Sequence, residues 1–161
     1  MLYITLKNYL SNIKQNKIKI INHWAENNNV KKILDDKKVN KDLFVKRYAF
    51  AILEHFIWVI EEEKITNNSS EVKDFLKYLK KKHIDINELF TLYTNFKNAI
   101  IHFFKEEDVL SLELISEIDE LFEKYFELIL KEYTKKLNDV QTALNKSIDI
   151  VDKNIIMSRT D

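Results

Sequence analysis

One segment decides the fold class: residues 48–60, which read YAFAILEHFIWVI. Hydrophobic side chains occupy nearly the whole circumference of the helix that this segment would form, a pattern typical of a helix at the centre of a domain. Thirteen residues that include Glu54 and His55 are too few and too polar to cross a bilayer. The segment therefore predicts a central helix of a globular domain, and Asn40 can cap the N-terminus of that helix.

The sequence before this segment predicts a long amphipathic helix. It ends near the three asparagines at residues 27–29, and a short amphipathic piece follows at residues 30–34. Hydrophobic residues recur three or four positions apart in the long helix, and those expected to face the core are Leu6, Leu10, Ile13, Ile18, Ile21 and Trp24.

Two further helices are predicted after the central one. Residues 66–70 have the composition of a loop, and residues 71–81 have helical periodicity. Asp85, followed three residues later by Glu88, is typical of a capping box and predicts the start of the next helix. We expect that helix to place Leu89, Phe90, Tyr93, Phe96, Ile100 and Phe103 on one face.

The C-terminal part predicts one very long helix. No helix breaker occurs for some forty residues after Leu110, which corresponds to roughly 60 Å. A helix with one hydrophobic face needs a partner, so we expect a parallel homodimer. The seam of that dimer would follow the four-three spacing of a coiled coil: Phe126, Leu130, Tyr133, Leu137, Val140 and Leu144.

The composition excludes several classes of protein. The 161 residues contain no glycine, no proline and no cysteine. Tight β-hairpins and phosphate-binding loops need glycine, and disulfides, zinc ribbons and thiol nucleophiles need cysteine. These observations predict an all-α fold.

The charge balance and the N-terminus bear on partners and location. Twenty-six basic and twenty-six acidic residues cancel, so no net field would hold the chain on nucleic acid or on an anionic membrane. The first residues lack the pattern of a signal peptide. We therefore expect a cytoplasmic protein that binds neither nucleic acid nor a membrane.

The last eight residues, 154–161, read NIIMSRTD. Ile155, Ile156 and Met157 form a β-type hydrophobic run, and the segment resembles the lead-in to a PAS domain of bacterial signalling proteins. This resemblance implies that the chain is truncated within a longer protein. The expected organisation is a helical sensory domain over residues 1–125, a coiled-coil signalling helix over 126–154 and the start of a PAS domain over 155–161.

The body of the chain also resembles a known family. His23-Trp24, residues 75–79, residues 83–90 and residues 96–101 are similar in pattern to the RsbR-type sensor domains of the stressosome. That family usually has a glycine just before its fourth helix, and this chain has none. The resemblance implies a globin-like helical bundle without haem, which dimerises and leads through a long C-terminal signalling helix to an output domain.

These observations together predict the N-terminal sensory and dimerisation domain of a cytoplasmic bacterial signal-transduction protein, of the histidine kinase or diguanylate cyclase type. No catalytic constellation is present, so we expect the chain not to be an enzyme, and we expect no cofactor. An unidentified small ligand or protein partner would act on the core. The candidate pocket residues are His55, Phe56, Phe90, Tyr93 and Phe96.

Three alternatives remain open. The first is a haem-based gas sensor, because His83-Ile84-Asp85-Ile86 looks like the segment around the proximal ligand of globin-coupled sensors. The second is a histidine phosphotransfer domain that uses His102, which lies in the sequence His-Phe-Phe-Lys. The third is a structural dimerisation module without a ligand. The four histidines are scattered along the chain without the spacing of a metal site.

Overall fold

The structure is a computed structural model that describes the backbone of residues 2–66 and 69–159 and the side chains of residues 2–66 and 69–135. All regular secondary structure in these residues is helical, which confirms the all-α prediction. The chain divides into two units, Met1–Leu128 and Ile129–Asp161. None of the described helices is both long enough and apolar enough to cross a membrane.

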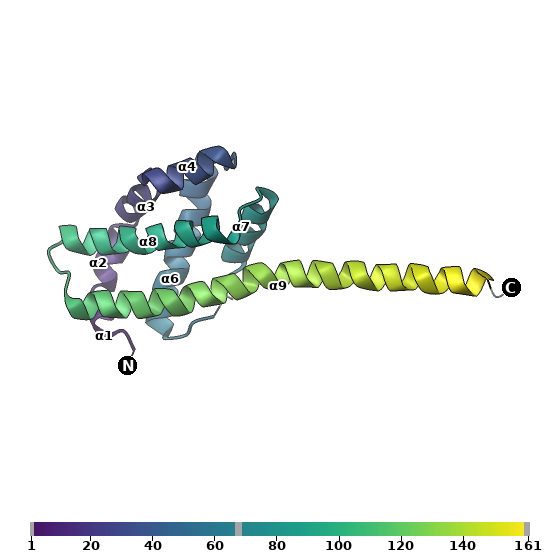
Figure 1. Cartoon of the computed structure of the whole chain (residues 1–161). Coiled ribbons are helices and arrows are strands. Elements are labelled where there is room, and N and C mark those ends of the chain that lie inside the picture. Colours follow the sequence, from purple (N-terminus) through teal and green to yellow (C-terminus); the bar gives the residue numbers. More distant parts are fainter. Residues whose placement is uncertain (1, 67–68, 160–161) are drawn as a thin grey trace. The chain divides into compact units, whose positions relative to one another are not determined.

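The first unit holds all the helices except the later part of the last one. In chain order they are α1 (Ile4–Asn8), α2 (Leu10–Gln15), α3 (Lys17–Glu26), α4 (Asn28–Asp36), α5 (Lys41–Leu43), the π-helix η1 (Phe44–Ala49), α6 (Phe50–Glu62), α7 (Ser70–Lys81), α8 (Ile86–Glu106) and α9 (Leu112–Arg159), as Figure 1 shows. The second unit is the continuation of α9 from Ile129 onward.

The predicted caps of the later helices are confirmed. Asn40 accepts a hydrogen bond from the backbone N–H of Leu43 at 3.0 Å. The Asp85 carboxylate accepts one from the N–H of Glu88 at 2.8 Å, and the Glu88 carboxylate accepts one from the N–H of Asp85 at 3.0 Å. This reciprocal pair is a complete capping box, so α8 begins where the sequence predicts.

The N-terminal stretch is not the single helix that its periodicity predicts. It is divided into α1, α2 and α3 by breaks at Tyr9 and Asn16. The Asn16 amide donates to the carbonyl of Asn12 at 2.8 Å, which satisfies an acceptor at the end of α2. The buried face nevertheless continues from Leu10 and Ile13 to Trp24, and Ile18 lies away from it. As a result, Ile18 is 65% exposed rather than buried, and Ile20 is buried instead.

A π-helical segment, η1, precedes α6 without a gap. Sequence periodicity does not reveal it, since its apolar residues also suit an α-helix. Phe44, Tyr48 and Ala49 of this segment are all buried. A π-helix carries an extra residue in the turn, so the buried faces of α5 and α6 are offset from each other at this point.

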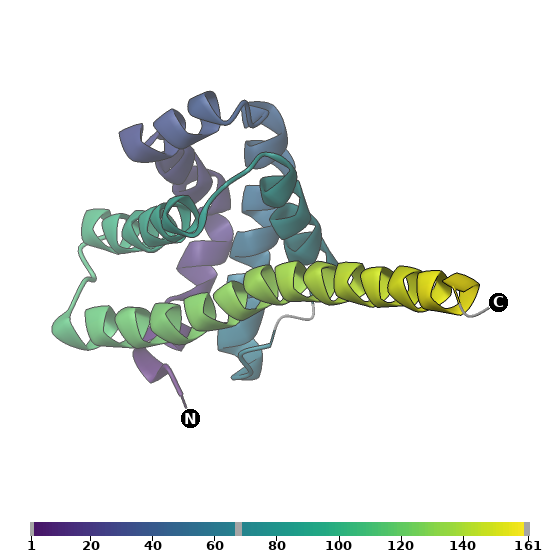
Figure 2. The ribbon, with the colours of Figure 1, turned by 45° about the vertical axis from the view of Figure 1, so that its right-hand side comes forward.

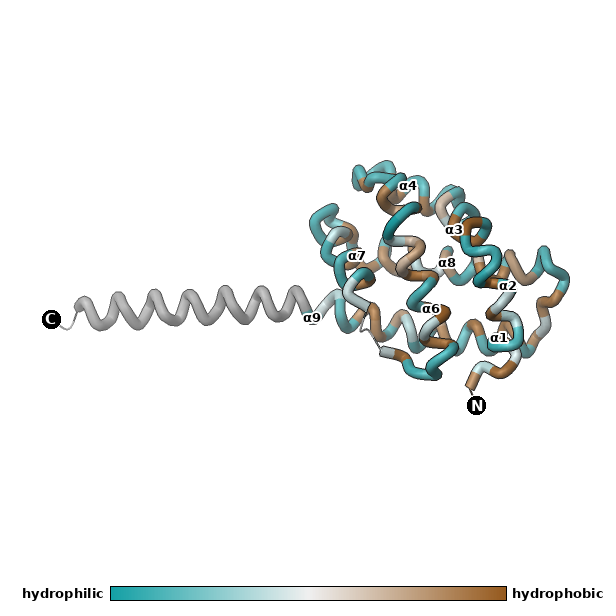
Figure 3. Tube along the Cα trace, turned by 180° about the vertical axis from the view of Figure 1, so that it is seen from behind, coloured by the Kyte–Doolittle hydropathy of each residue, from teal (hydrophilic) through white to brown (hydrophobic). Residues whose placement is uncertain are grey.

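An aromatic core joins the helices of the first unit. The Phe96 ring lies 4.7 Å from Trp24, 5.6 Å from Phe56 and 5.4 Å from Phe122, measured between ring centroids. These four rings belong to α8, α3, α6 and α9. In Figures 1 and 2, α6 crosses α8 and the first part of α9, which run side by side. In Figure 3, hydrophobic positions alternate with hydrophilic ones along α3, α6 and α8, as burial on one side of each helix requires.

Four helices end in a left-handed residue although the chain has no glycine. Lys38, Glu63, His83 and Asp108 have φ angles of 54°, 55°, 60° and 57° after α4, α6, α7 and α8. The N–H of His83 bonds the carbonyl of Lys80, and the N–H of Ile84 bonds that of Leu79, the two bonds of a Schellman motif. His83 thus occupies the position that usually holds glycine.

The C-terminal strand expected at residues 155–157 is not formed, because the backbone is helical through Arg159. A lone short strand has no partner for its backbone groups, whereas a helix satisfies them internally. The side chains of residues 136–161 lie outside the described residues, and the PAS domain remains a prediction.

We predict that Phe96→Ala lowers the free energy of unfolding by about 3–5 kcal/mol, because it leaves a cavity where the four rings meet. Denaturant unfolding followed by circular dichroism measures this loss. Phe90→Ala is the matched control, since Phe90 lies on the same helix but is 54% exposed. It should lower the free energy of unfolding by about 1 kcal/mol or less.

We also predict that His83→Gly raises the free energy of unfolding by roughly 0.5–1 kcal/mol, because glycine adopts a left-handed φ without the steric penalty of a Cβ atom. The same denaturant measurement checks it. His83→Ala is the control, since alanine retains the Cβ. Equal stability of the two variants would contradict a strained turn.

Candidate ligand-binding site

A hollow of about 310 Å³ opens between α6 and the start of α7. Four of its residues recur at the spacing of a single helical face on α6, and the remaining two come from the first turn of α7 and the residue before it. The lining residues are Ala51, Glu54, His55, Trp58, Ser69 and Glu71. The hollow therefore combines an apolar wall with one buried imidazole and two carboxylates.

His55 is the buried polar group of this hollow. Its side chain is 7% exposed, and its Nδ1 lies 2.8 Å from the hydroxyl oxygen of Tyr125 on α9. Its Nε2 is also buried. The Trp58 ring lies nearly parallel to the imidazole, at 5.9 Å between centroids and 11° between planes. The imidazole is therefore held in the core by the Tyr125 hydroxyl and by ring packing.

Burial sets the protonation state of this pair. Desolvation lowers the pKa of His55, and a hydrogen bond with the backbone of Thr66 opposes that lowering to a smaller extent. Desolvation also raises the pKa of the Tyr125 hydroxyl. Both side chains are therefore neutral near pH 7, and a neutral imidazole carries only one N–H.

The sequence named His55 as a pocket residue, and its side chain lines this hollow. It did not identify Tyr125 as the partner, because 70 residues separate the two on different helices. Trp58, Ala51 and Glu71 were not among the predicted pocket residues either. Their three- and four-residue spacing around His55 on α6 could have indicated Ala51 and Trp58.

The other predicted pocket residues do not surround this hollow. Phe56 and Phe96 are fully buried in the aromatic core. Tyr93 and Phe90 line a different hollow, of about 370 Å³, between α8 and α9. Phe90 was expected to face inward but is 54% exposed, because the buried stripe of α8 passes through the neighbouring Leu89. The five predicted pocket residues thus lie in three separate places: the hollow beside His55, the aromatic core, and the hollow between α8 and α9.

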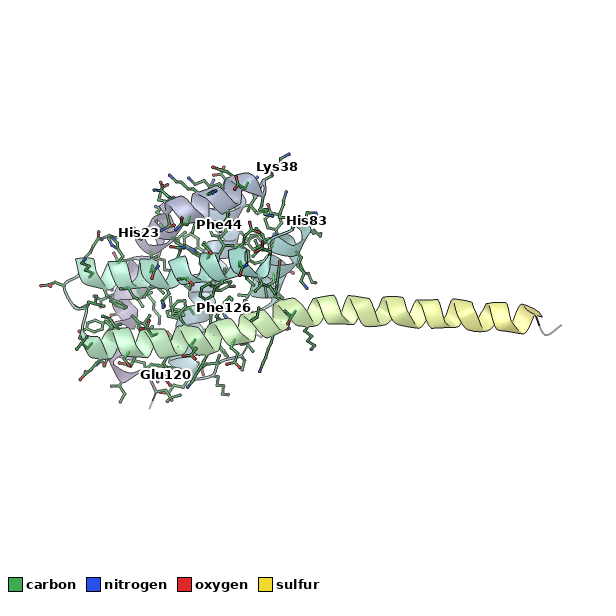
Figure 4. All side chains as sticks on the ribbon, viewed as in Figure 1. His23, Lys38, Phe44, His83, Glu120 and Phe126 are labelled. Carbon is green, nitrogen blue, oxygen red and sulfur yellow. The ribbon has the colours of Figure 1, made fainter. Side chains whose placement is uncertain are left out.

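His83 does not lie near those aromatic residues. Its side chain is exposed at the turn after α7, as Figure 4 shows. The Nζ atom of Lys37 donates to its backbone carbonyl at 3.2 Å. A haem iron needs an imidazole directed into an apolar pocket. Phe56 and Phe96 instead contact each other in the core, so these residues do not fit a haem bound through His83.

His102 stacks on His23 of α3, with 3.9 Å between ring centroids and 3° between planes. Its Nε2 lies 2.9 Å from a carboxylate oxygen of Glu106, whose other oxygen lies 3.1 Å from the Nζ of Lys19. Burial, together with the nearby His102, lowers the pKa of His23, and Glu106 opposes that lowering. A phosphotransfer histidine needs a free ring nitrogen, and here Nε2 already pairs with a carboxylate.

The predicted dimer seam is described only at its beginning. The Phe126 ring lies 5.4 Å from Phe90 and 5.9 Å from Tyr93 within the first unit. Leu130 and Tyr133 belong to the second unit. The side chains of Leu137, Val140 and Leu144 lie outside the described residues. The whole seam, Phe126 included, remains a prediction.

No cluster of three or more histidine, aspartate or glutamate side chains suited to a metal ion occurs where side chains are described. Comparison with known proteins found no matching family model, no matching curated protein and no matching solved structure.

The lowered pKa of His55 predicts a pH dependence of stability. In the unfolded chain His55 has its ordinary pKa of 6.5, whereas in the folded protein it takes up a proton only at lower pH, because its pKa is lowered. Around and below pH 6.5 the unfolded state therefore binds more protons than the folded state. The free energy of unfolding decreases as the pH is lowered. The contribution of His55 to the free energy of unfolding is complete above pH 6.5. It is lost as the pH falls through the pKa of His55 in the folded protein.

We expect His55→Phe to flatten the stability profile between about pH 7.5 and 5 relative to the wild type, as measured by denaturant unfolding at several pH values. His83→Gln serves as the control, because it removes a histidine but leaves His55 in place. Parallel profiles for wild type and His55→Phe would show that His55 titrates alike in the folded and unfolded states.

Proposed function

We propose that the chain is the N-terminal sensory and dimerisation domain of a cytoplasmic bacterial signalling protein with a kinase or cyclase output, and that it has a globin-like fold without haem. In this proposal the chain itself catalyses no reaction. It binds a small ligand in the hollow beside His55 and transmits the binding event along α9.

The single observation that supports this proposal best is the hydrogen bond between His55 and Tyr125. It links the hollow on α6 directly to α9 through two buried side chains, at 2.8 Å. The Tyr125 ring also lies 6.5 Å from Phe56 and 6.2 Å from Tyr93, which belong to α6 and α8. A displacement of α6 therefore acts on α9 through polar and apolar contacts together.

The proposed mechanism is a shift between two arrangements of α6 against α9. A ligand that fits the hollow in one arrangement better than in the other favours that arrangement by the difference in its binding free energy. A difference of about 1–2 kcal/mol changes the population ratio between roughly fivefold and thirtyfold. Tyr125 lies on the same unbroken helix as residues 129–159, so a rotation of α9 at Tyr125 would be passed along the chain.

Dimerisation would convert that rotation into an output. In the predicted seam, Leu137 and Leu144 lie one heptad apart. In a parallel dimer each would meet its own counterpart in the second copy. A rotation of both helices would change which residues meet at the seam. An output domain attached after the helix would receive this change as a new relative orientation.

We predict that the purified chain is a dimer at tens of micromolar and that Leu137→Lys with Leu144→Lys converts it to a monomer, because two lysine pairs cannot share an apolar seam. Size-exclusion chromatography with light scattering measures the mass. Asn138→Lys with Asn145→Lys is the matched control: it adds the same charges one residue further along each heptad, off the seam. A monomeric wild type, or dissociation by both double variants alike, would contradict the proposal.

A further inference from the structure

The hollow beside His55 is lined by negative charge. The carboxylates of Glu54 and Glu71 both belong to its lining, and no lysine or arginine occurs among the described side chains that line it. His55 adds no positive charge near pH 7, because burial lowers its pKa. The lining therefore attracts a cation and repels an anion.

Both carboxylates are available to a ligand. Their side chains are exposed, so neither is held in a buried ion pair. The Glu54 carboxylate lies 3.6 Å from the Nζ of Lys17, which is not part of the lining. An ion pair this long and this exposed is weak and can rearrange when a second cation arrives.

The N-terminus of α7 opposes this charge only in part. A helix N-terminus carries roughly half a positive charge, whereas the two carboxylates carry two full negative charges. The Ser69 hydroxyl already caps the helix by accepting a hydrogen bond from the N–H of Val72 at 3.2 Å, and Glu71 lies in the first turn. The balance at the hollow stays negative.

Trp58 supplies a wall that suits an organic cation. The face of an indole carries negative electrostatic potential, which attracts an ammonium group, and its carbon surface packs against apolar groups. Trp58 is 36% exposed, and its ring lies nearly parallel to the imidazole of His55, which is itself bonded to Tyr125. Ala51 adds an apolar methyl group beside it. A volume of about 310 Å³ suits a small molecule.

We infer that the hollow binds a small organic ammonium ion, whose charge is balanced by Glu54 and Glu71 and whose apolar body packs against Trp58. This inference rests on the proposed sensory function, since it names the class of ligand that would act there. The ligand is a free molecule that carries one positive charge on a compact apolar group.

Three probes with the same ring separate charge from shape. Benzylamine is a cation, benzyl alcohol has a hydroxyl in place of the ammonium group, and benzoate is an anion. Titrations of the whole chain followed by NMR shifts of the Ala51 methyl and the Trp58 indole measure their binding. Trp24, which is buried in the core, is the internal reference.

We expect benzylamine to bind with a dissociation constant on the order of millimolar, about tenfold more tightly than either other probe. Raising the salt concentration from about 0.05 to 0.5 M should weaken benzylamine binding several-fold and leave benzyl alcohol unchanged, because salt screens exposed charges.

Variants assign the contacts. Glu71→Gln should weaken benzylamine binding about threefold, and Glu54→Gln with Glu71→Gln about tenfold, while benzyl alcohol is unaffected by either. Trp58→Leu, followed at the Ala51 methyl, should weaken benzylamine about fivefold, because leucine keeps an apolar contact but has no ring face. Glu62→Gln, an exposed position on α6 outside the lining, is the matched control and should leave all three probes unchanged.

A lysine of a partner protein would present the same ammonium group. Nα-acetyl-lysine amide tests this source, since it carries the group on a flexible chain that must be ordered on binding. We expect it to bind several-fold less tightly than benzylamine. Tighter binding would show that the site takes a protein side chain and would overturn the assignment to a free molecule.

Other results would also overturn the inference: no benzylamine binding, benzyl alcohol or benzoate binding as tightly, or benzylamine binding that the double glutamine variant does not weaken. The proposed function fails separately. If benzylamine binds as expected but the wild-type chain is monomeric by light scattering, the ligand class stands and the signalling role does not. If the chain is dimeric but binds none of the probes, the ligand class is wrong and the dimer remains.

Discussion

The first unit depends on the contact of the Phe96 ring with three rings from three other helices. Trp24, Phe56 and Phe122 reach it from α3, α6 and α9 at centroid distances between 4.7 and 5.6 Å. The indole N–H of Trp24 also donates to the carbonyl of Leu92 at 2.9 Å, which fixes α3 against α8 in orientation as well as in distance. Large aromatic side chains bury much surface for few rotatable bonds, so a short chain can hold its helices together this way.

The candidate site is placed by this core. His55 precedes Phe56 on α6, and Tyr125 comes three residues after Phe122 on α9. Once the rings of Phe56 and Phe122 meet, the neighbouring turn of each helix is brought together, and the imidazole reaches the hydroxyl. The same arrangement directs the Trp58 face of α6 toward the start of α7, where the hollow opens. A polar link between α6 and α9 is thus a consequence of apolar packing.

The sequence predicted the parts of the fold that local chemistry determines. The capping box at Asp85 and the cap at Asn40 have side chains that act within their own turn, so the residue types alone were sufficient. The breaks at Tyr9 and Asn16 were missed, because short helices and one long helix share the same three- and four-residue spacing. The partnership of His55 with Tyr125 could not be predicted, since it depends on the packing of helices that are far apart in the chain. The stacking of His23 on His102 escaped prediction for the same reason.

The π-helix before α6 has a consequence for how that helix can move. Its turn holds one residue more than an α-turn, so the chain between Asn40 and His55 is longer than the axial distance requires. If the surplus residue passed from one end of the segment to the other, the intervening turn would twist about its axis while both ends stayed in place. The extra residue therefore gives the helix a way to rotate ahead of His55 while the packing of the neighbouring helices is kept.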